Sequence, residues 1–230
     1  LIKYMEQILF GLHDFLKKHV GFTKEVSIKE LADKVSAKGF VIGSCVAPVW
    51  GSSTLGGPEE EKIFLTQIEK ACRISQKLRD LGVRPYGVIR IDSSASPAQW
   101  TADPEGSQQK IVDVFRQACD IAADYGESLA AEGEICWGGM HNWKDMLDLL
   151  EMVDRPNMGF QADMAHTLLY LLGHLRGNMA GHHLAKQEFT ISGLIEIFCG
   201  FRPRFIFIEY NYFFQIAQLE TDRYLHCQVH

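Results

Sequence analysis

The sequence lacks the features that mark membrane-spanning, exported and nucleic-acid-binding chains. It has no run of 18 apolar residues, so we expect no membrane-spanning helix. Charged residues interrupt residues 1–19, so we expect no signal peptide there. Lys and Arg number 23 against 29 Asp and Glu, a formal net charge of −6, whereas a nucleic-acid surface needs clustered basic residues. We therefore expect a cytoplasmic protein with neither a membrane nor a nucleic-acid partner.

Two further motifs are absent. No C-x-x-C pair occurs among the six cysteines, which favours reduced, buried thiols in a reducing compartment. No glycine-rich phosphate loop is evident, so nothing in the sequence supports a phosphorylated substrate. The cysteines are Cys45, Cys72, Cys119, Cys136, Cys199 and Cys227.

The chain of 230 residues, 47% hydrophobic and 23% charged, suits one globular domain over residues 1–230. From residue 27 onward, helical and extended patterns alternate, which predicts a parallel α/β architecture. We expect residues 1–20 to form an amphipathic helix, with no strand before it. The expected helices are 27–39, 58–82, 108–125 and one between 134 and 158; the expected strands are 40–46, 86–91, 128–131, 158–162 and 205–210.

Other segments give narrower expectations. Residues 96–106 are expected to form a polar loop, and part of 211–230 a helix. Arg90 and Asp92 share one side of a strand and are expected to pair with each other in a structural role. Trp50, at the end of a strand, could stack on the apolar face of a sugar or simply pack over the mouth of a barrel.

Two of the apolar runs end in acidic residues. Residues 128–131 lead to Glu132 and Glu134, and residues 158–162 lead to Asp163 and then His166. Because strand ends meet at one rim of a parallel barrel, these groups predict a divalent-metal and acid–base site. Glu132 and Glu134 have the same parity along the strand; we favour Glu132 as the inward carboxylate and keep Glu134 as the alternative.

These strand ends, their spacing and the turn VDRPNMGF resemble the sugar phosphate isomerase/epimerase family over residues 27–173. That family has the xylose isomerase-like TIM barrel and includes an endonuclease branch, against which the acidic charge speaks. The resemblance implies a (β/α)₈ barrel. Since such a barrel usually has about 250 residues, we expect it to be incomplete or truncated at both ends.

The resemblance also implies a divalent ion (Mn, Mg, Co or Zn) held by two Glu, one Asp and one His at four strand ends. Glu132 and Asp163 match two of these ligands, and Glu209, at the end of a late strand, could be the second Glu. His182 and His183 are weak candidates for the histidine. His166 matches a histidine that contacts substrate oxygens.

The chemistry implied is isomerisation or epimerisation of a small-molecule sugar. A divalent ion lowers the cost of forming an enediolate, and carboxylates on either face, Glu132 and Glu209, remove and return the proton. Trp137 and His141, in the loop after Glu132, could line the pocket or only cap the barrel. The alternative is a barrel relative with an incomplete metal site that binds a ligand or is inactive. A homo-oligomer remains open.

Overall fold

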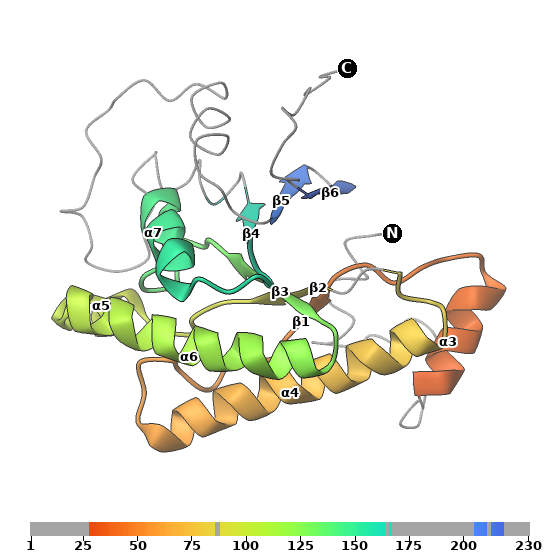
Figure 1. Cartoon of the computed structure of the whole chain (residues 1–230), viewed down its shortest axis with the longest axis horizontal. Helices are drawn as coiled ribbons and strands as arrows, with labels where there is room; N and C mark the ends of the chain where they lie inside the picture. The colour runs from red at the N-terminus through yellow and green to blue at the C-terminus, as the bar shows by residue number, and fades with distance from the viewer. Residues whose placement is uncertain (1–27, 86–87, 164–165, 167–204, 211–212, 219–230) are drawn as a thin grey trace.

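The computed structural model describes residues 28–85, 88–163, 166, 205–210 and 213–218 (Figure 1). Helices and strands alternate over most of this part of the chain, as the sequence pattern predicts. The predicted helix at residues 1–20 lies outside the described residues. The elements are α3 (Ile28–Ala37), β1 (Cys45–Val46), α4 (Pro58–Asp80), β2 (Val88–Ile91), α5 (Pro97–Ala102), α6 (Pro104–Asp124), β3 (Ser128–Glu132), α7 (Trp143–Val153), β4 (Met158–Asp163), β5 (Phe205–Tyr210) and β6 (Phe213–Gln218).

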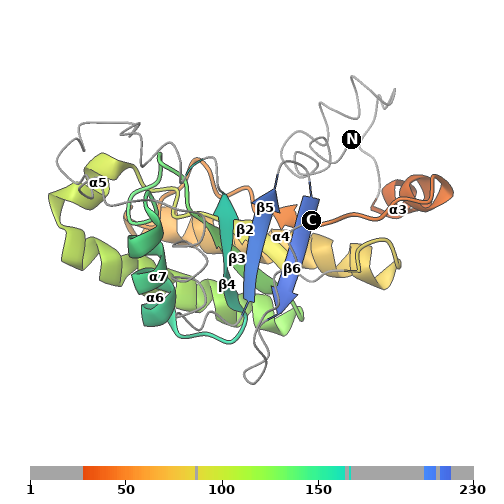
Figure 2. The ribbon, with the colours of Figure 1, turned by 90° about the horizontal axis from the view of Figure 1, so that it is seen from above.

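The strands form one six-stranded sheet in the order β1-β2-β3-β4-β5-β6. Strands β1 to β5 are parallel to their neighbours, and β6 runs antiparallel to β5 (Figure 2). The predicted parallel α/β architecture is therefore confirmed. Within the described part of the chain, β1 and β6 form the two edges of the sheet, which does not close into a barrel there.

Helices α4, α6 and α7 cover one face of the sheet. Figure 1 shows α4 and α6 running beneath the strands, and the two helices contact each other as well as the strands. Phe64 of α4 and Phe115 of α6 are fully buried, and their rings stack with centroids 6.3 Å apart. Alternate strand residues join these rings in the main core: Ile89, Ile91, Leu129, Ala131, Met158, Phe160 and Ala162.

The other face of the sheet carries the residues in between. Since successive side chains along a strand point to opposite faces, Arg90, Glu132 and Gln161 point away from the helices. This is the face that a barrel turns inward. The residues beneath them, Val88 and Ala130, form a small apolar cluster separate from the main core. The packing of one face against the helices thereby fixes which residues lie on the opposite face, which is called the free face below because none of the three helices covers it.

One predicted strand was too long. The strand expected over 40–46 is reduced to Cys45–Val46, and Phe40 and Val41 are 43% and 54% exposed. An apolar run indicates which residues could be buried in a sheet. The length of the strand is decided by backbone pairing with β2, which joins only Cys45 to Ile89 and Val46 to Arg90. Of residues 211–230, part of which was expected to be helical, Phe213–Gln218 is a strand, and the rest lies outside the described residues.

The predicted loop at 96–106 is also wrong, because it contains α5 and the start of α6. Ser96 accepts a hydrogen bond from the backbone N–H of Gln99, and the Gln99 side chain accepts one from the backbone N–H of Ser96. This capping box, with Pro97 in the first turn, is a helix-start signal in an otherwise polar stretch. Asp103 then caps α6 by accepting from the N–H of Gly106 at 3.1 Å.

Candidate functional site

The C-terminal ends of β2, β3 and β4 place polar residues side by side on the free face of the sheet. Arg90 of β2 pairs in register with Ala130, and Glu132 pairs with Gln161 of β4. The backbone of Asp163, two residues farther along β4, is paired with that of Glu209 on β5. The acidic residues predicted from the sequence therefore lie together at the C-terminal ends of neighbouring parallel strands.

Arg90 lies between two carboxylates. Its Nε forms an ion pair with Oε2 of Glu132, and its Nη2 pairs with Oε1 of Glu134. Oε1 of Glu132 also accepts a hydrogen bond from Nε2 of Gln161 at 2.9 Å. Only 5% of Glu132 is exposed, so these contacts are shielded from water. The structure brings both Glu132 and Glu134 to the site, and the choice of base between them stays a prediction.

His166 connects Glu134 to Asp163. Its Nε2 lies 3.9 Å from Oε2 of Glu134 and 3.8 Å from Oδ2 of Asp163, and its backbone N–H donates to Oδ1 of Asp163 at 3.2 Å. Sγ of Cys136 donates to Oε2 of Glu134 at 3.2 Å. Burial, and then the nearby Glu134, raise the pKa of the Cys136 thiol to about 12, which keeps it a hydrogen-bond donor.

Trp50 and Asp92 form the β1–β2 side of the site. The indole Nε1 donates to Oδ2 of Asp92 at 2.9 Å, and the Arg90 guanidinium lies 6.0 Å from the centroid of the Trp50 ring. Trp50 is 42% exposed, so part of it faces solvent beside the acidic groups. Asp92 is buried, which raises its pKa to about 6; the charge of Arg90 and the Trp50 hydrogen bond oppose this shift.

The predicted structural pair between Arg90 and Asp92 was wrong. The guanidinium pairs instead with Glu132 and Glu134 on the adjacent strand and the loop after it. Asp92 accepts its hydrogen bonds from the Trp50 indole and from the backbone N–H of Ser94, at 2.8 Å.

His141 and Trp137 pack against side chains away from the strand-end groups. His141 is 3% exposed and makes an edge-on contact with the Trp100 ring at 5.0 Å between centroids. Its Nε2 is 3.5 Å from Oδ2 of Asp145, in the first turn of α7. Trp137 is partly buried and packs against the main core. These surroundings fit the capping alternative better than a position in an open pocket.

Sequence reasoning missed Gln161 and Cys136. Gln161 is a polar residue inside the otherwise apolar run MGFQA, a signal that the free face becomes polar before the strand ends. Cys136 follows Glu134 by two residues and carried no distinguishing pattern. The weak candidates His182 and His183 lie outside the described residues. In the described part of the chain, no three His, Cys, Asp or Glu side chains are arranged to hold a metal ion.

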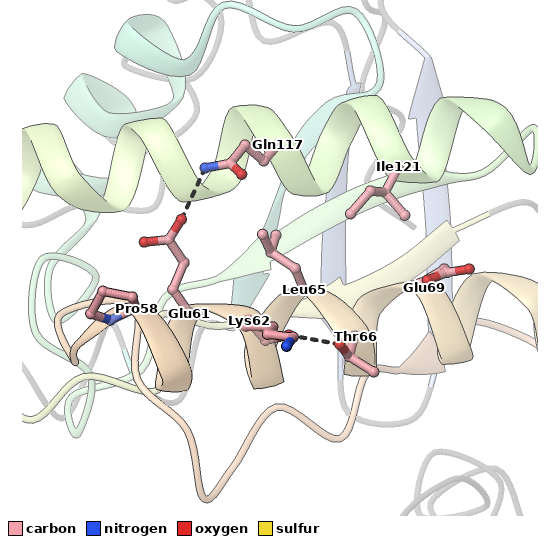
Figure 3. A pocket seen from close by; sticks show the side chains of 8 residues that line it. All are labelled: Pro58, Glu61, Lys62, Leu65, Thr66, Glu69, Gln117 and Ile121. Atoms are coloured by element: carbon pink, nitrogen blue, oxygen red, sulfur yellow. Dashed lines mark hydrogen bonds between the residues drawn. The ribbon is translucent and has the colours of Figure 1, made fainter.

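A hollow of about 360 Å³ lies elsewhere, between α4 and α6 (Figure 3). Glu61 and Gln117 face each other across it and share a hydrogen bond of 3.1 Å. All of its lining residues come from the outer helix layer, and none from the strand ends. The lining residues are Pro58, Glu61, Lys62, Leu65, Thr66, Glu69, Gln117 and Ile121.

An open α/β sheet with carboxylates, an imidazole and a guanidinium at the C-terminal ends of its parallel strands has the arrangement of one part of a TIM barrel. Residues 3–189 match the xylose isomerase-like TIM barrel family, and the chain belongs to this family. The match extends on both sides of residues 27–173, where the sequence resemblance was clearest. No curated protein matches the chain. No helix of the described residues is long and apolar enough to cross a membrane.

Three solved structures illustrate the similarity. A D-tagatose 3-epimerase-like protein is 18% identical with a TM-score of 0.52, and the match covers 60% of this chain and 51% of that chain. A 3-keto-D-glucoside 4-epimerase from E. coli is 15% identical with a TM-score of 0.55, covering 80% and 64%. An AP endonuclease of family 2 from Brucella melitensis is 14% identical with a TM-score of 0.53, covering 78% and 75%. The chain thus spans about half the length of the first structure, and these identities show the fold alone.

Proposed function

We propose that the protein is a divalent-metal-dependent sugar isomerase or epimerase. The observation that carries the proposal is the shared strand edge: Glu132 and Asp163 end neighbouring parallel strands on the free face, and Glu209 is paired with Asp163 in register. Two of the similar structures are named as sugar epimerases or epimerase-like proteins, which supports this class of reaction and a small-molecule sugar as substrate.

The donor set fits a divalent cation by its chemistry. Carboxylate oxygens of Glu132, Asp163 and Glu209 are hard ligands of the kind that Mg²⁺ and Mn²⁺ prefer, and such sites also accept Co²⁺ or Zn²⁺. When bound, the ion would polarise the substrate carbonyl and so ease loss of the neighbouring carbon-bound proton. A divalent ion at Glu132 would have to compete with the Arg90 guanidinium, which pairs with this carboxylate in the structure.

The proposal assigns a role to each of these side chains. Glu132 takes the proton from one face of the substrate, and Gln161 holds that carboxylate in place through its 2.9 Å hydrogen bond. Glu209 returns a proton from the other face. His166, beside Asp163, donates to a substrate oxygen, and the exposed part of Trp50 packs against the apolar face of the sugar.

A second candidate is a barrel relative that binds its ligand without a metal, or is inactive. It is favoured by the ion pairs of Arg90, which give both Glu132 and Glu134 a positive partner without any added cation. The described residues also lack a preformed group of three metal ligands. A nuclease function is disfavoured by the net charge of −6, since a DNA-binding surface needs clustered positive charge.

Metal content and proton exchange separate these candidates. The purified chain is assayed for bound divalent ions, and then incubated with Mn²⁺ and a panel of ketoses and aldoses in D₂O, with deuterium incorporation followed by NMR. We expect stoichiometric Mn²⁺ uptake and exchange at a carbon next to the carbonyl. Glu132→Gln should lower the exchange rate by about 10²- to 10⁴-fold, the usual contribution of a general base.

Asp163→Asn should weaken Mn²⁺ binding, because it removes an anionic ligand. Asp148→Asn is the matched control, since that carboxylate lies on the exposed side of α7, paired with Lys144. A chain that takes up no divalent ion would support the second candidate. Metal uptake with equal exchange in Glu132→Gln and the wild type would refute the assigned role of Glu132.

A further inference from the structure

Arg90 carries a positive charge among the acidic residues at the C-terminal ends of the strands. One guanidinium contacts Glu132 through Nε and Glu134 through Nη2, and its side chain is only 11% exposed. The Trp50 ring lies on the third side, 6.0 Å away. A side chain held by two carboxylates and an aromatic face at the end of a strand has a defined position, unlike a surface arginine in water.

The carboxylates need such a partner. Glu132 and Glu134 both contact the same guanidinium, so the two carboxylates lie within a few ångströms of each other. Asp163 is linked to Glu134 through His166, which lies close to both. Like charges at this distance, in a site that is largely buried, raise the free energy of the folded chain unless a cation lies between them. Arg90 supplies that positive charge from within the chain.

We propose that Arg90 is an exchangeable counter-cation: it pairs with Glu132 and Glu134 in the metal-free protein, and a divalent ion displaces it from Glu132. The inference rests on the proposed function and adds a regulatory step to the same site. A divalent ion and a guanidinium on one carboxylate would repel each other in a low-dielectric site. Glu134 and the Trp50 ring remain as partners for the displaced guanidinium, so the exchange leaves Arg90 beside the substrate position.

The competing explanation is that Arg90 is only a scaffold that keeps Glu132 in place for the metal. The two explanations predict opposite changes in metal affinity when the guanidinium is removed. If Arg90 competes with the ion, removing the guanidinium tightens metal binding and destabilises the metal-free protein. If Arg90 is a scaffold, removing it loosens Glu132 and weakens metal binding.

The test is a calorimetric titration of the full chain with Mn²⁺, together with thermal unfolding with and without the ion. Arg90→Met removes the charge but keeps an aliphatic chain of similar length. Arg155→Met is the matched control, because it removes the same charge from an exposed pair with Asp120. Arg90→Lys keeps the charge but lacks the separate Nε and Nη2 groups that contact Glu132 and Glu134, and it provides the comparison if Arg90→Met does not fold.

We expect Arg90→Met to bind Mn²⁺ at least about tenfold more tightly than the wild type, the effect of losing one charge-assisted contact. Its metal-free form should unfold at a lower temperature and gain more on adding Mn²⁺ than the wild type does. Arg90→Lys should lie between the two, and Arg155→Met should match the wild type.

Two results would overturn the inference. Equal or weaker Mn²⁺ binding by both Arg90 variants would refute the exchange and leave the proposed metal-dependent function standing. No Mn²⁺ uptake by the wild type or by either variant would refute both, and the two failures are thereby distinguished.

Discussion

The buried ion pair at the N-terminal ends of β2 and β3 should be a sensitive point of the fold. Glu127 accepts hydrogen bonds from Nη1 of Arg84 at 2.9 and 3.0 Å, and both side chains are 0% exposed. Nη2 of Arg84 also donates to the carbonyl of Val88 at 2.5 Å. Because Arg84 precedes β2 and Glu127 precedes β3, this pair ties together the strands that carry Arg90 and Glu132 at their other ends.

Glu127→Gln leaves the Arg84 guanidinium buried without its anionic partner. Breaking a buried ion pair from one side costs about 3–5 kcal/mol, and we expect about 3 kcal/mol because glutamine keeps one carbonyl acceptor. In a chain of this size, such a loss lowers the unfolding midpoint by roughly 6–12 °C. It is also a large part of the free energy of unfolding of an ordinary domain, about 5–15 kcal/mol.

Thermal and urea unfolding, followed by circular dichroism, measure this loss. The control is Asp120→Asn, which breaks a solvent-exposed pair with Arg155 and should change the midpoint little. The double variant Arg84→Met/Glu127→Leu replaces both buried charges by apolar groups and should recover part of the loss, since the partly exposed Arg79 still loses its contact with Glu127. A Glu127→Gln midpoint equal to that of Asp120→Asn would show that the pair is not an essential part of the core.

Two further perturbations follow from the structure. Burial raises the pKa of Asp92 from 3.8 to about 6, so the folded chain holds this proton more tightly than the unfolded chain does. The resulting stability is fully present below pH 3.8 and is lost as the pH rises through about 6. Asp92→Asn should therefore flatten the change in unfolding free energy between pH 4 and 7, and an unchanged slope would contradict it. In Gly138→Ala the new Cβ would lie 2.6 Å from Cβ of Trp100 and 2.7 Å from the carbonyl of Ser96. We expect the free energy of unfolding, measured by thermal unfolding, to fall by about 1–3 kcal/mol. Gly43→Ala is the control, because nothing lies within 4 Å of its new Cβ, and equal unfolding midpoints for the two variants would refute the clash.

The strands that carry the site were predictable because their sequence signal is local. Strands β3 and β4 are buried on both faces, so they read as short apolar runs that stop at Glu132 and Asp163. Strand β1 was overestimated for the same reason: Phe40 and Val41 are apolar, but they have no place in the ladder to β2. The capping box at Ser96 was equally local, yet the polar composition around it suggested a loop.

The sequence by itself determined the alternation of helices and strands and the acidic residues at the strand ends, because both depend on neighbours within a few positions. Only the tertiary structure decided the partners of Arg90. Asp92 follows β2 directly, two residues after Arg90, whereas Glu132 lies on the adjacent strand, two residues beyond the register partner Ala130; the guanidinium nevertheless pairs with Glu132. Sequence distance cannot rank these choices, because it does not state which strands lie side by side or in what register.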